Sequence, residues 1–365
     1  MWNYIAKRVL QAIPTLLVIS FLIFSLLYVT PGDPVYIMLG SGDTQSFTEE
    51  EYEAARHELG LDKPMLVRYA DFLKNAVKGD LGTSYITDED VFTAIMQRLP
   101  ATLVLTVAAV FLGLLISIPL GILAAIRHNS IWDSIATFLA TIGTSLPKFW
   151  FGLVLIIFFS QNLGILPSQG MAYIDDGLGP FLSHLILPAS SLALGLAATQ
   201  TRMIRSSMLD VLSQDYVRFA RSKGLKEYAV IIGHAMKNAM IPVVTVIGSE
   251  FGALLGGAVV TETIFAWPGV GRLAMNSIAK RDYPMIQGNT LVLCALFLLT
   301  NLIIDIICAW LNPKIRLDKE GKEEDLCTQN NLTAQIKRPP TGRMWPDSFS
   351  KTKLQCWVFS FCQLL

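Results

Sequence analysis

Long apolar stretches alternate with polar segments along this chain of 365 residues. A helix needs about 20 apolar residues to cross the roughly 30 Å hydrocarbon core of a bilayer. Six stretches reach that length, and several contain a proline, which membrane helices tolerate, so we expect kinked spans. The predicted spans are 9–29, 101–126, 135–161, 182–200, 240–265 and 288–311. The pattern therefore predicts an all-α, polytopic membrane protein with about six transmembrane helices.

The basic residues orient these spans. The first apolar stretch follows Lys7 and Arg8 and is too long for the hydrophobic region of a secretory signal, so we interpret it as a retained helix that starts in the cytoplasm. Twelve basic residues then fall on the cytoplasmic side, while the loop between the fifth and sixth spans disagrees, because it holds Arg272, Lys280 and Arg281. Both termini are predicted to be cytoplasmic. The cytoplasmic set is Lys7, Arg8, Arg127, Arg202, Arg205, Arg218, Arg221, Lys223, Lys226, Lys237, Lys314 and Arg316.

Composition supports the membrane interpretation and excludes other classes. Hydrophobic residues make up 52% of the chain and charged residues only 16%, so membrane lipid is an expected partner. Basic and acidic residues are equal at 29 each, which gives no indication of a nucleic-acid partner. The five cysteines lack the paired spacing of metal ligands, so we expect neither a metal site nor a disulfide framework.

Three segments organise the chain. Residues 1–98 are predicted to hold the first transmembrane helix and an extracytoplasmic insertion, whose amphipathic stretches predict a small helical cap or a solvated insertion without substrate contact. Residues 99–318 are predicted to form a five-helix permease core with a cytoplasmic loop at about 202–238. Residues 319–365 are polar and broken by prolines, which predicts a disordered appendage or, alternatively, a peripheral anchor.

The cytoplasmic loop carries a short amphipathic helix pattern. Tyr216, Val217, Phe219 and Ala220 can present an apolar surface between basic residues, and such a helix suits a groove on a partner. Gly224 supplies a left-handed or unhindered position where one short helix ends and the next begins. Basic amphipathic loops also lie at anionic headgroups, which is the competing interpretation.

The segments DYVRFARSKGL and HAMKNAMIP in this loop resemble the EAA loop of ABC-transporter importer permeases, in particular the subgroup serving dipeptides, oligopeptides, glutathione and nickel. Further short matches follow in order over residues 4–317, among them TPGDP at 30–34, RLPATL at 98–103 and LPKFWFG at 146–152. The tail from Lys319 has no counterpart in this family. The matching loop residues are Asp215, Tyr216, Val217, Arg218, Ala220, Lys223 and Gly224, then His234, Ala235, Asn238, Ala239, Ile241 and Pro242.

The resemblance implies an ABC type I importer permease fold in the plasma (inner) membrane of a bacterium or archaeon. It implies four partners of three kinds: a second homologous permease subunit, two cytoplasmic ATPase subunits and an extracytoplasmic solute-binding protein. ATP and Mg²⁺ are expected in the partner ATPase, so this chain would bind no cofactor and perform no covalent chemistry. The loop from Asp215 to Gly224 would couple it to the ATPase. Dipeptides or oligopeptides are the expected cargo, with nickel, glutathione or another small solute as alternatives.

Four polar or aromatic residues in the spans are candidates for the pathway or its gate. Lys148 in the third span and Glu250 in the fifth are costly at bilayer depth, which predicts a pair or two pathway-facing groups, with packing or snorkelling as the alternative. Glu262 and Trp267 stand at the outer end of the fifth span, where the family's outer gate would lie. Trp267 is alternatively an interfacial aromatic.

The fifth span also contains a stripe of small residues. Gly248, Gly252 and Gly256 recur at a four-residue spacing that lets another helix approach closely. The neighbour is predicted to be a partner subunit or the mobile gate, or else another helix of this chain.

Motifs of other functional classes do not occur in the sequence. It contains no G-x-x-x-x-G-K-[ST] phosphate loop, so the ATPase is expected on another chain. It also has no H-E-x-x-H or G-x-S-x-G, which argues against an intramembrane enzyme. An ion-coupled secondary carrier is the remaining alternative from another class, although carriers usually show more spans and internal repeats.

Overall fold

The computed structural model describes residues 2–29, 35, 48–58 and 60–311, so the tail from residue 319 lies outside the described residues. Within these ranges the chain is helical and has no strand, only an isolated antiparallel bridge between Thr83 and Asp90. The helices are α1 (Trp2–Val29), α3 (Glu49–Glu58), α4 (Met65–Val77), α5 (Val91–Ile126), α6 (Ile131–Ser145), α7 (Lys148–Leu155) with a π-helix (Ile156–Asn162), a 3-10 turn (Ile174–Asp176), α8 (Leu178–Leu212), α9 (Asp215–Ser222), a π-helix (Ala229–Ala235), α10 (Met236–Gly257), α11 (Val259–Ile264), α12 (Val270–Lys280) and α13 (Tyr283–Leu311).

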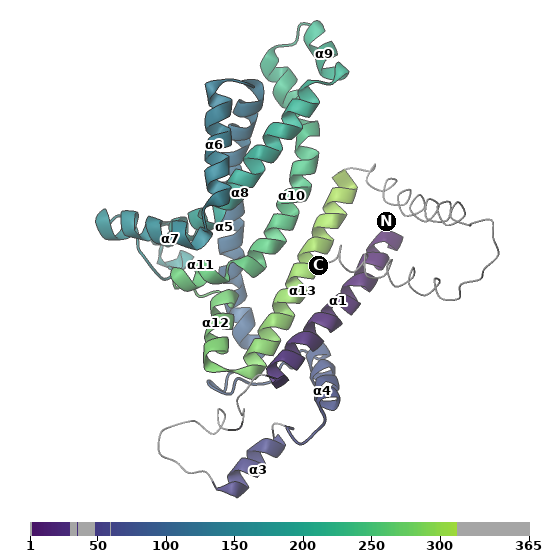
Figure 1. Cartoon of the computed structure of the whole chain (residues 1–365), viewed down its shortest axis with the longest axis vertical. Coiled ribbons are helices and arrows are strands. Elements are labelled where there is room, and N and C mark those ends of the chain that lie inside the picture. The colour runs from purple at the N-terminus through teal and green to yellow at the C-terminus, as the bar shows by residue number, and fades with distance from the viewer. Residues whose placement is uncertain (1, 30–34, 36–47, 59, 312–365) are drawn as a thin grey trace, which may run out of the picture. The chain divides into compact units, whose positions relative to one another are not determined.

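Five described segments are long and apolar enough to cross a membrane, and a bent pair brings the number to as many as six. The segments lie in α1, α5, α8, α10 with its preceding π-helix, and α13. Neighbours α5 and α8, α8 and α10, and α10 and α13 pack against one another, as Figure 1 shows. The predicted all-α membrane protein with about six spans is therefore confirmed.

The third predicted span is not one helix. The sequence predicts a single, kinked span over 135–161, whereas α6 ends at Ser145 and the next helical segment, Lys148–Asn162, is bent from it by 101°. Leu146 and Pro147 between them are extended, with ψ of 128° at both residues. A proline disfavours helical backbone at the residue before it and lacks the N–H that would continue the ladder. The bend therefore follows from Pro147.

Small residues hold α5 and α8 together. A Cβ atom at Gly113 would meet the Leu196 side chain at 2.3 Å, and one at Gly121 would meet the Ile204 side chain at 2.8 Å. Both helices can approach closely only because these positions lack a side chain. This packing forms the centre of the helical bundle, and it positions α8, which leads directly into α9.

The glycine stripe of the fifth predicted span faces another helix of this chain. A Cβ at Gly248 would meet Ile304 at 2.2 Å, and one at Gly252 would meet Asn301 at 3.1 Å, both on α13. Gly256 has open space around it. The contact at the first two glycines is thus intramolecular. The helix itself ends at Gly257, and α11 continues as a separate short helix where the sequence predicts the span to run to 265.

The segment between α1 and α5, which is predicted to be extracytoplasmic, contains the two helices α3 and α4. Helix α4 lies against α1, because the Tyr69 hydroxyl donates to the Leu17 carbonyl at 2.9 Å and lies 2.8 Å from the Ser20 hydroxyl. The Tyr69 ring also packs edge-on against Phe21 and Phe24. These contacts fix α4 to the first helix.

Candidate coupling loop and outer gate

Helix α9 is a short helix at the end of α8, and Figure 1 shows it beyond the long helices, at the end opposite α12. It begins after Gln214 in extended backbone, with Asp215 in its first turn, where a carboxylate favours a helix N-terminus. It ends at Ser222, and two residues later Gly224 has a φ of +78° and donates its N–H to the Arg221 carbonyl at 2.9 Å. The left-handed position predicted at Gly224 is therefore confirmed.

One face of α9 forms a small core with its own flanks. Val217 and Ala220 are buried against Val230, Val211 and Leu212. The sequence analysis placed all four apolar residues of the helix on a surface for a partner, and that is wrong for these two. A helix of this length is marginal alone, so it needs this packing to be stable.

The other face of α9 is exposed. Phe219 is 61% exposed, and the Lys223 ammonium lies 4.7 Å above the centre of its ring. The Tyr216 hydroxyl accepts a hydrogen bond from the Asn238 side-chain amide at 2.8 Å. Tyr228, at 74% exposure, extends the aromatic surface beyond the glycine turn. An exposed aromatic surface next to the exposed Asp215 and Arg218 suits a partner protein.

An ion pair closes the turn that follows α9. The Arg221 guanidinium donates to both carboxylate oxygens of Glu227, at 3.2 and 2.7 Å, across Gly224. This pairing lowers the pKa of Glu227 and raises that of Arg221. The contribution of the pair to the stability of the loop is therefore present above the ordinary glutamate pKa, and it is lost as pH falls through the lowered pKa of Glu227. Sequence reasoning did not single out this pair.

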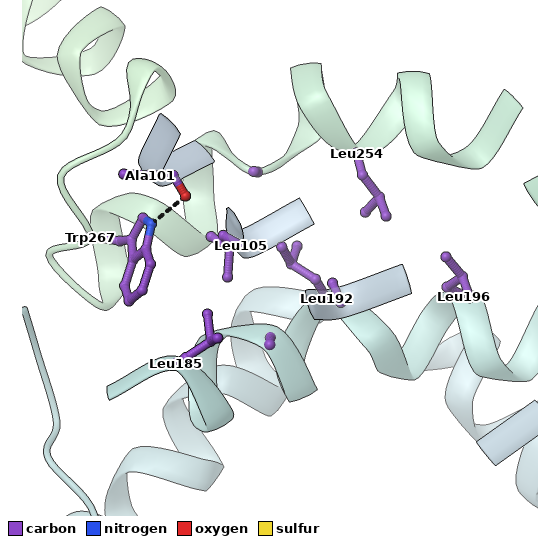
Figure 2. Close-up of a cluster of buried hydrophobic side chains, with 10 residues drawn as sticks. Ala101, Leu105, Leu185, Leu192, Leu196, Leu254 and Trp267 are labelled. Carbon is purple, nitrogen blue, oxygen red and sulfur yellow. Dashed lines mark hydrogen bonds between the residues drawn. The ribbon is translucent and has the colours of Figure 1, made fainter. Parts of the chain in front are cut away.

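Trp267 lies at the other end of the helices and is fully buried, so it is not an interfacial aromatic. Its indole Nε1 donates to the Ala101 carbonyl at 2.9 Å, as the dashed line in Figure 2 marks. Its ring belongs to a core with Leu105, Leu185 and Leu192. Trp267 thus fixes the segment after α11 to the beginning of the transmembrane part of α5.

Glu262 is also fully buried, and it caps α12. Its carboxylate accepts from the Thr102 hydroxyl at 2.7 Å and from the Arg272 backbone N–H at 2.9 Å. The Thr102 hydroxyl in turn accepts the Val270 N–H at 2.9 Å. A carboxylate and a hydroxyl therefore satisfy free N–H groups at the helix start. Gly269 leaves room for this carboxylate, since a Cβ there would lie 2.2 Å from Oε1.

Lys148 and Glu250 form no ion pair with each other in the described part of the chain. Lys148 is exposed at the first position of α7, directly after the bend, and its Cε lies 3.2 Å from where a Cβ of Gly195 would stand. Glu250 is half-buried on α10. The structure therefore places them on different helices without joining them.

A charged cluster that the sequence analysis missed lies at the start of α6. Asp133 is buried and paired with Arg205 of α8, 72 positions later in the chain. The sequence offered one signal for this pair: two opposite charges that each lie close to the end of a predicted span. Their partnership depends on how α6 and α8 pack.

The chain matches one family over most of its length. Residues 117–317 match the family described as binding-protein-dependent transport system inner membrane component. Residues 1–106 match the N-terminal family of such membrane components. The first match alone covers more than half of the sequence. The chain therefore belongs to the family of binding-protein-dependent transport system inner membrane components.

Several curated relatives are similar over their whole length. The dipeptide transport system permease protein DppB of Escherichia coli strain K12 is 40% identical over 342 residues, covering 87% of this chain and 100% of the relative. The di/tripeptide transport system permease protein DppB of Pseudomonas aeruginosa is 40% identical, covering 87% and 99%. The oligopeptide transport system permease protein AppB of Bacillus subtilis is 43% identical, covering 86% and 98%.

A solved structure shares the fold. An inward-facing conformation of the MetNI methionine ABC transporter has a TM-score of 0.50 and 18% identity, covering 60% of this chain and 96% of that one. This likeness concerns the fold alone. Together with the family match it confirms the predicted fold of an importer permease.

Proposed function

We propose that this chain is the transmembrane subunit of an ATP-driven importer and forms half of a translocation pathway for dipeptides or oligopeptides. The observation that carries the proposal is α9, a short helix at the end of α8 with its own core on one face and exposed aromatic residues on the other. A helix built in this way fits a groove on a partner. The cargo follows from the peptide permeases among the relatives.

The proposed assembly contains a second homologous permease subunit, two cytoplasmic ATPase subunits and an extracytoplasmic solute-binding protein, in a plasma membrane. ATP and Mg²⁺ belong to the ATPase subunits. Their closure on ATP would move α9, and α8 and α10 would carry the movement into the bundle. The chain then alternates between two states whose balance the ATPase shifts.

The predicted gate residues take two roles in this proposal. Lys148 and Glu250 line the pathway, where their charges remain hydrated in one of the two states. Glu262 and Trp267 act from inside the protein, because both are buried and hold the α11–α12 segment against α5. This segment is then a rigid outer gate that moves as one piece.

The test is uptake of a labelled dipeptide by cells that hold the complete set of subunits, comparing the intact chain with Gly224→Val, Gly224→Asn and Gly179→Val. A side chain in left-handed backbone costs about 1–2 kcal/mol. That cost lowers the ratio of chains with the native turn to chains without it by roughly 5- to 30-fold. We therefore expect uptake by Gly224→Val to fall by that factor. Gly224→Asn retains more uptake, since asparagine tolerates this conformation.

Gly179 is the matched control because it has open space and no left-handed backbone. Equal uptake by all four chains would remove the coupling role of the α9 turn. Import of nickel, glutathione or another solute in place of the dipeptide would retain the importer and change its cargo. Uptake that persists without any ATPase subunit would instead favour an ion-coupled carrier.

A further inference from the structure

A buried ion pair with several hydrogen bonds joins α6 to α8. Asp133, in the first turn of α6, is 4% exposed. The Arg205 guanidinium donates to both of its carboxylate oxygens, with Nη2 at 2.8 Å from Oδ2. The Asn129 backbone N–H donates to Oδ2 at 3.0 Å, and His128 Nδ1 lies 3.1 Å from the same atom. A two-point pair of this kind fixes orientation as well as distance.

The position of Arg205 connects this pair with the coupling helix. Arg205 lies about two turns before the end of α8 at Leu212, and α9 begins at Asp215. A displacement of α9 reaches Arg205 through continuous helix, apart from the short Ser213–Gln214 connection. Through its bond to Arg205, Asp133 is a group of α6 that such a displacement reaches directly.

Two further contacts hold α6 and the start of α7 against α8. A Cβ at Gly143 would stand 2.9 Å from the Ala198 Cβ, so the two helices touch near the end of α6. After the bend, the Ser191 hydroxyl donates to the Lys148 carbonyl at 2.9 Å. Helix α6 is thus attached to α8 along its length, and the bend lies between two of the attachments.

We propose that Asp133 and Arg205 are positioning residues for transport, which transmit the displacement of the coupling helix from α8 to α6 and so to the bend before Lys148. This inference rests on the proposed coupling role of α9. An ion pair suits the task because breaking it leaves a buried charge without compensation, so the two helices stay in register while they move. Apolar packing alone permits sliding at lower cost.

The experiment follows the bend directly and does not depend on the cargo. The reconstituted complex carries Lys148→Cys in a chain whose five native cysteines are replaced by serine. The rate at which a membrane-impermeant reagent modifies the new thiol is measured with and without ATP. We expect the ATP-induced change in the accessibility of this thiol to be about tenfold smaller in Asp133→Asn and in Arg205→Gln than in the intact chain. A factor of this size is typical for coupling between sites. The double variant Asp133→Arg with Arg205→Asp restores at least half of it.

Two measurements separate this role from a merely structural one. The ratio of peptide transported to ATP hydrolysed should fall with each single variant while ATP hydrolysis continues, and the double variant should raise it again. Arg127→Gln is the matched control, since Arg127 is an exposed cation in the connection between α5 and α6 and forms no bond to Asp133. We expect no change from it.

The outcomes separate this inference from the proposed function. A normal ATP response in Asp133→Asn, together with a lost response in Gly224→Val, would overturn the role of the pair and leave the coupling loop intact. A normal response in Gly224→Val would instead remove the coupling role of α9. Single variants that fail to assemble, with no recovery in the double variant, would assign the pair to folding and also overturn the inference.

Discussion

Trp267 is held at two points, by the apolar core around its ring and by the bond from its indole N–H to the Ala101 carbonyl. Both contacts join residues far apart in sequence, so the side chain connects the segment after α11 with α5. Glu262 does the same through the hydrogen bond that its carboxyl oxygen accepts from the Thr102 hydroxyl on α5. At the scale of single residues, the end of the bundle near α12 is therefore secured by two buried side chains that contact neighbouring positions of α5.

Truncating Trp267 should destabilise the protein substantially. Replacing a buried tryptophan by alanine costs about 3–5 kcal/mol, because apolar burial is lost and a cavity remains. We expect Trp267→Ala to lower the thermal unfolding temperature of the purified complex clearly, and to reduce uptake in proportion to the unfolded fraction. Trp132→Ala removes an exposed ring as a control. An unfolding temperature equal to that of the control would contradict the anchoring role.

At the scale of elements, the long helices could be predicted from the sequence, since span length and hydropathy are local properties. The left-handed turn at Gly224 was predictable for the same reason. A kink at Pro147 was predictable as well, but a complete break of the helix there was not, because Pro119 and Pro188 lie inside unbroken helices. The same residue type therefore has different outcomes, depending on contacts such as the one between Ser191 and the Lys148 carbonyl.

The roles of individual site residues depended more on tertiary contacts. Val217 and Tyr216 are adjacent in an amphipathic helix, and only the packing of Val230 shows which of them is buried. Trp267 stands where an interfacial aromatic is expected, but the fold buries it against α5 and α8. The pairing of Asp133 with Arg205 joins residues 72 positions apart, so no local pattern contains it.

The two faces of α9 should respond differently to substitution. Val217→Asp buries an unpaired carboxylate in the core of the loop, so we expect α9 to unfold, uptake to fail and the loop to become sensitive to protease. Phe219→Ser changes only the exposed face, so the loop stays protected from protease while less ATPase subunit copurifies with the permease. Limited proteolysis and copurification measure the two effects separately.

Glu227→Gln serves as the control for both variants, since the pair it removes is exposed and worth less than about 1 kcal/mol. We expect it to keep both protection and copurification close to the intact values. If Phe219→Ser retained the full amount of ATPase subunit, the exposed face would not be the docking surface. If Val217→Asp left the loop protected, its inner face would not be the core.

At the scale of the whole molecule, every residue to which we assign a role in transport lies in the part of the chain that matches the family. The match ends at residue 317. The coupling helix, the Asp133–Arg205 pair and the Glu262–Trp267 anchors all lie before Leu311, where α13 ends. Helix α13 packs against Gly248 and Gly252 of α10 through Phe297, Asn301 and Ile304.

Removal of the tail is therefore predicted to leave transport intact. A chain truncated after Asp318 should insert into the membrane, assemble with its partners and import the labelled dipeptide at the rate of the full chain. The matched control is a chain truncated after residue 296, which loses the side chains that fill the space beside Gly248 and Gly252. We expect that chain to be degraded or to lack uptake, because α10 then has no partner for its small-residue face. Uptake that fails in the first truncation, with normal insertion, would assign residues 319–365 a direct part in transport.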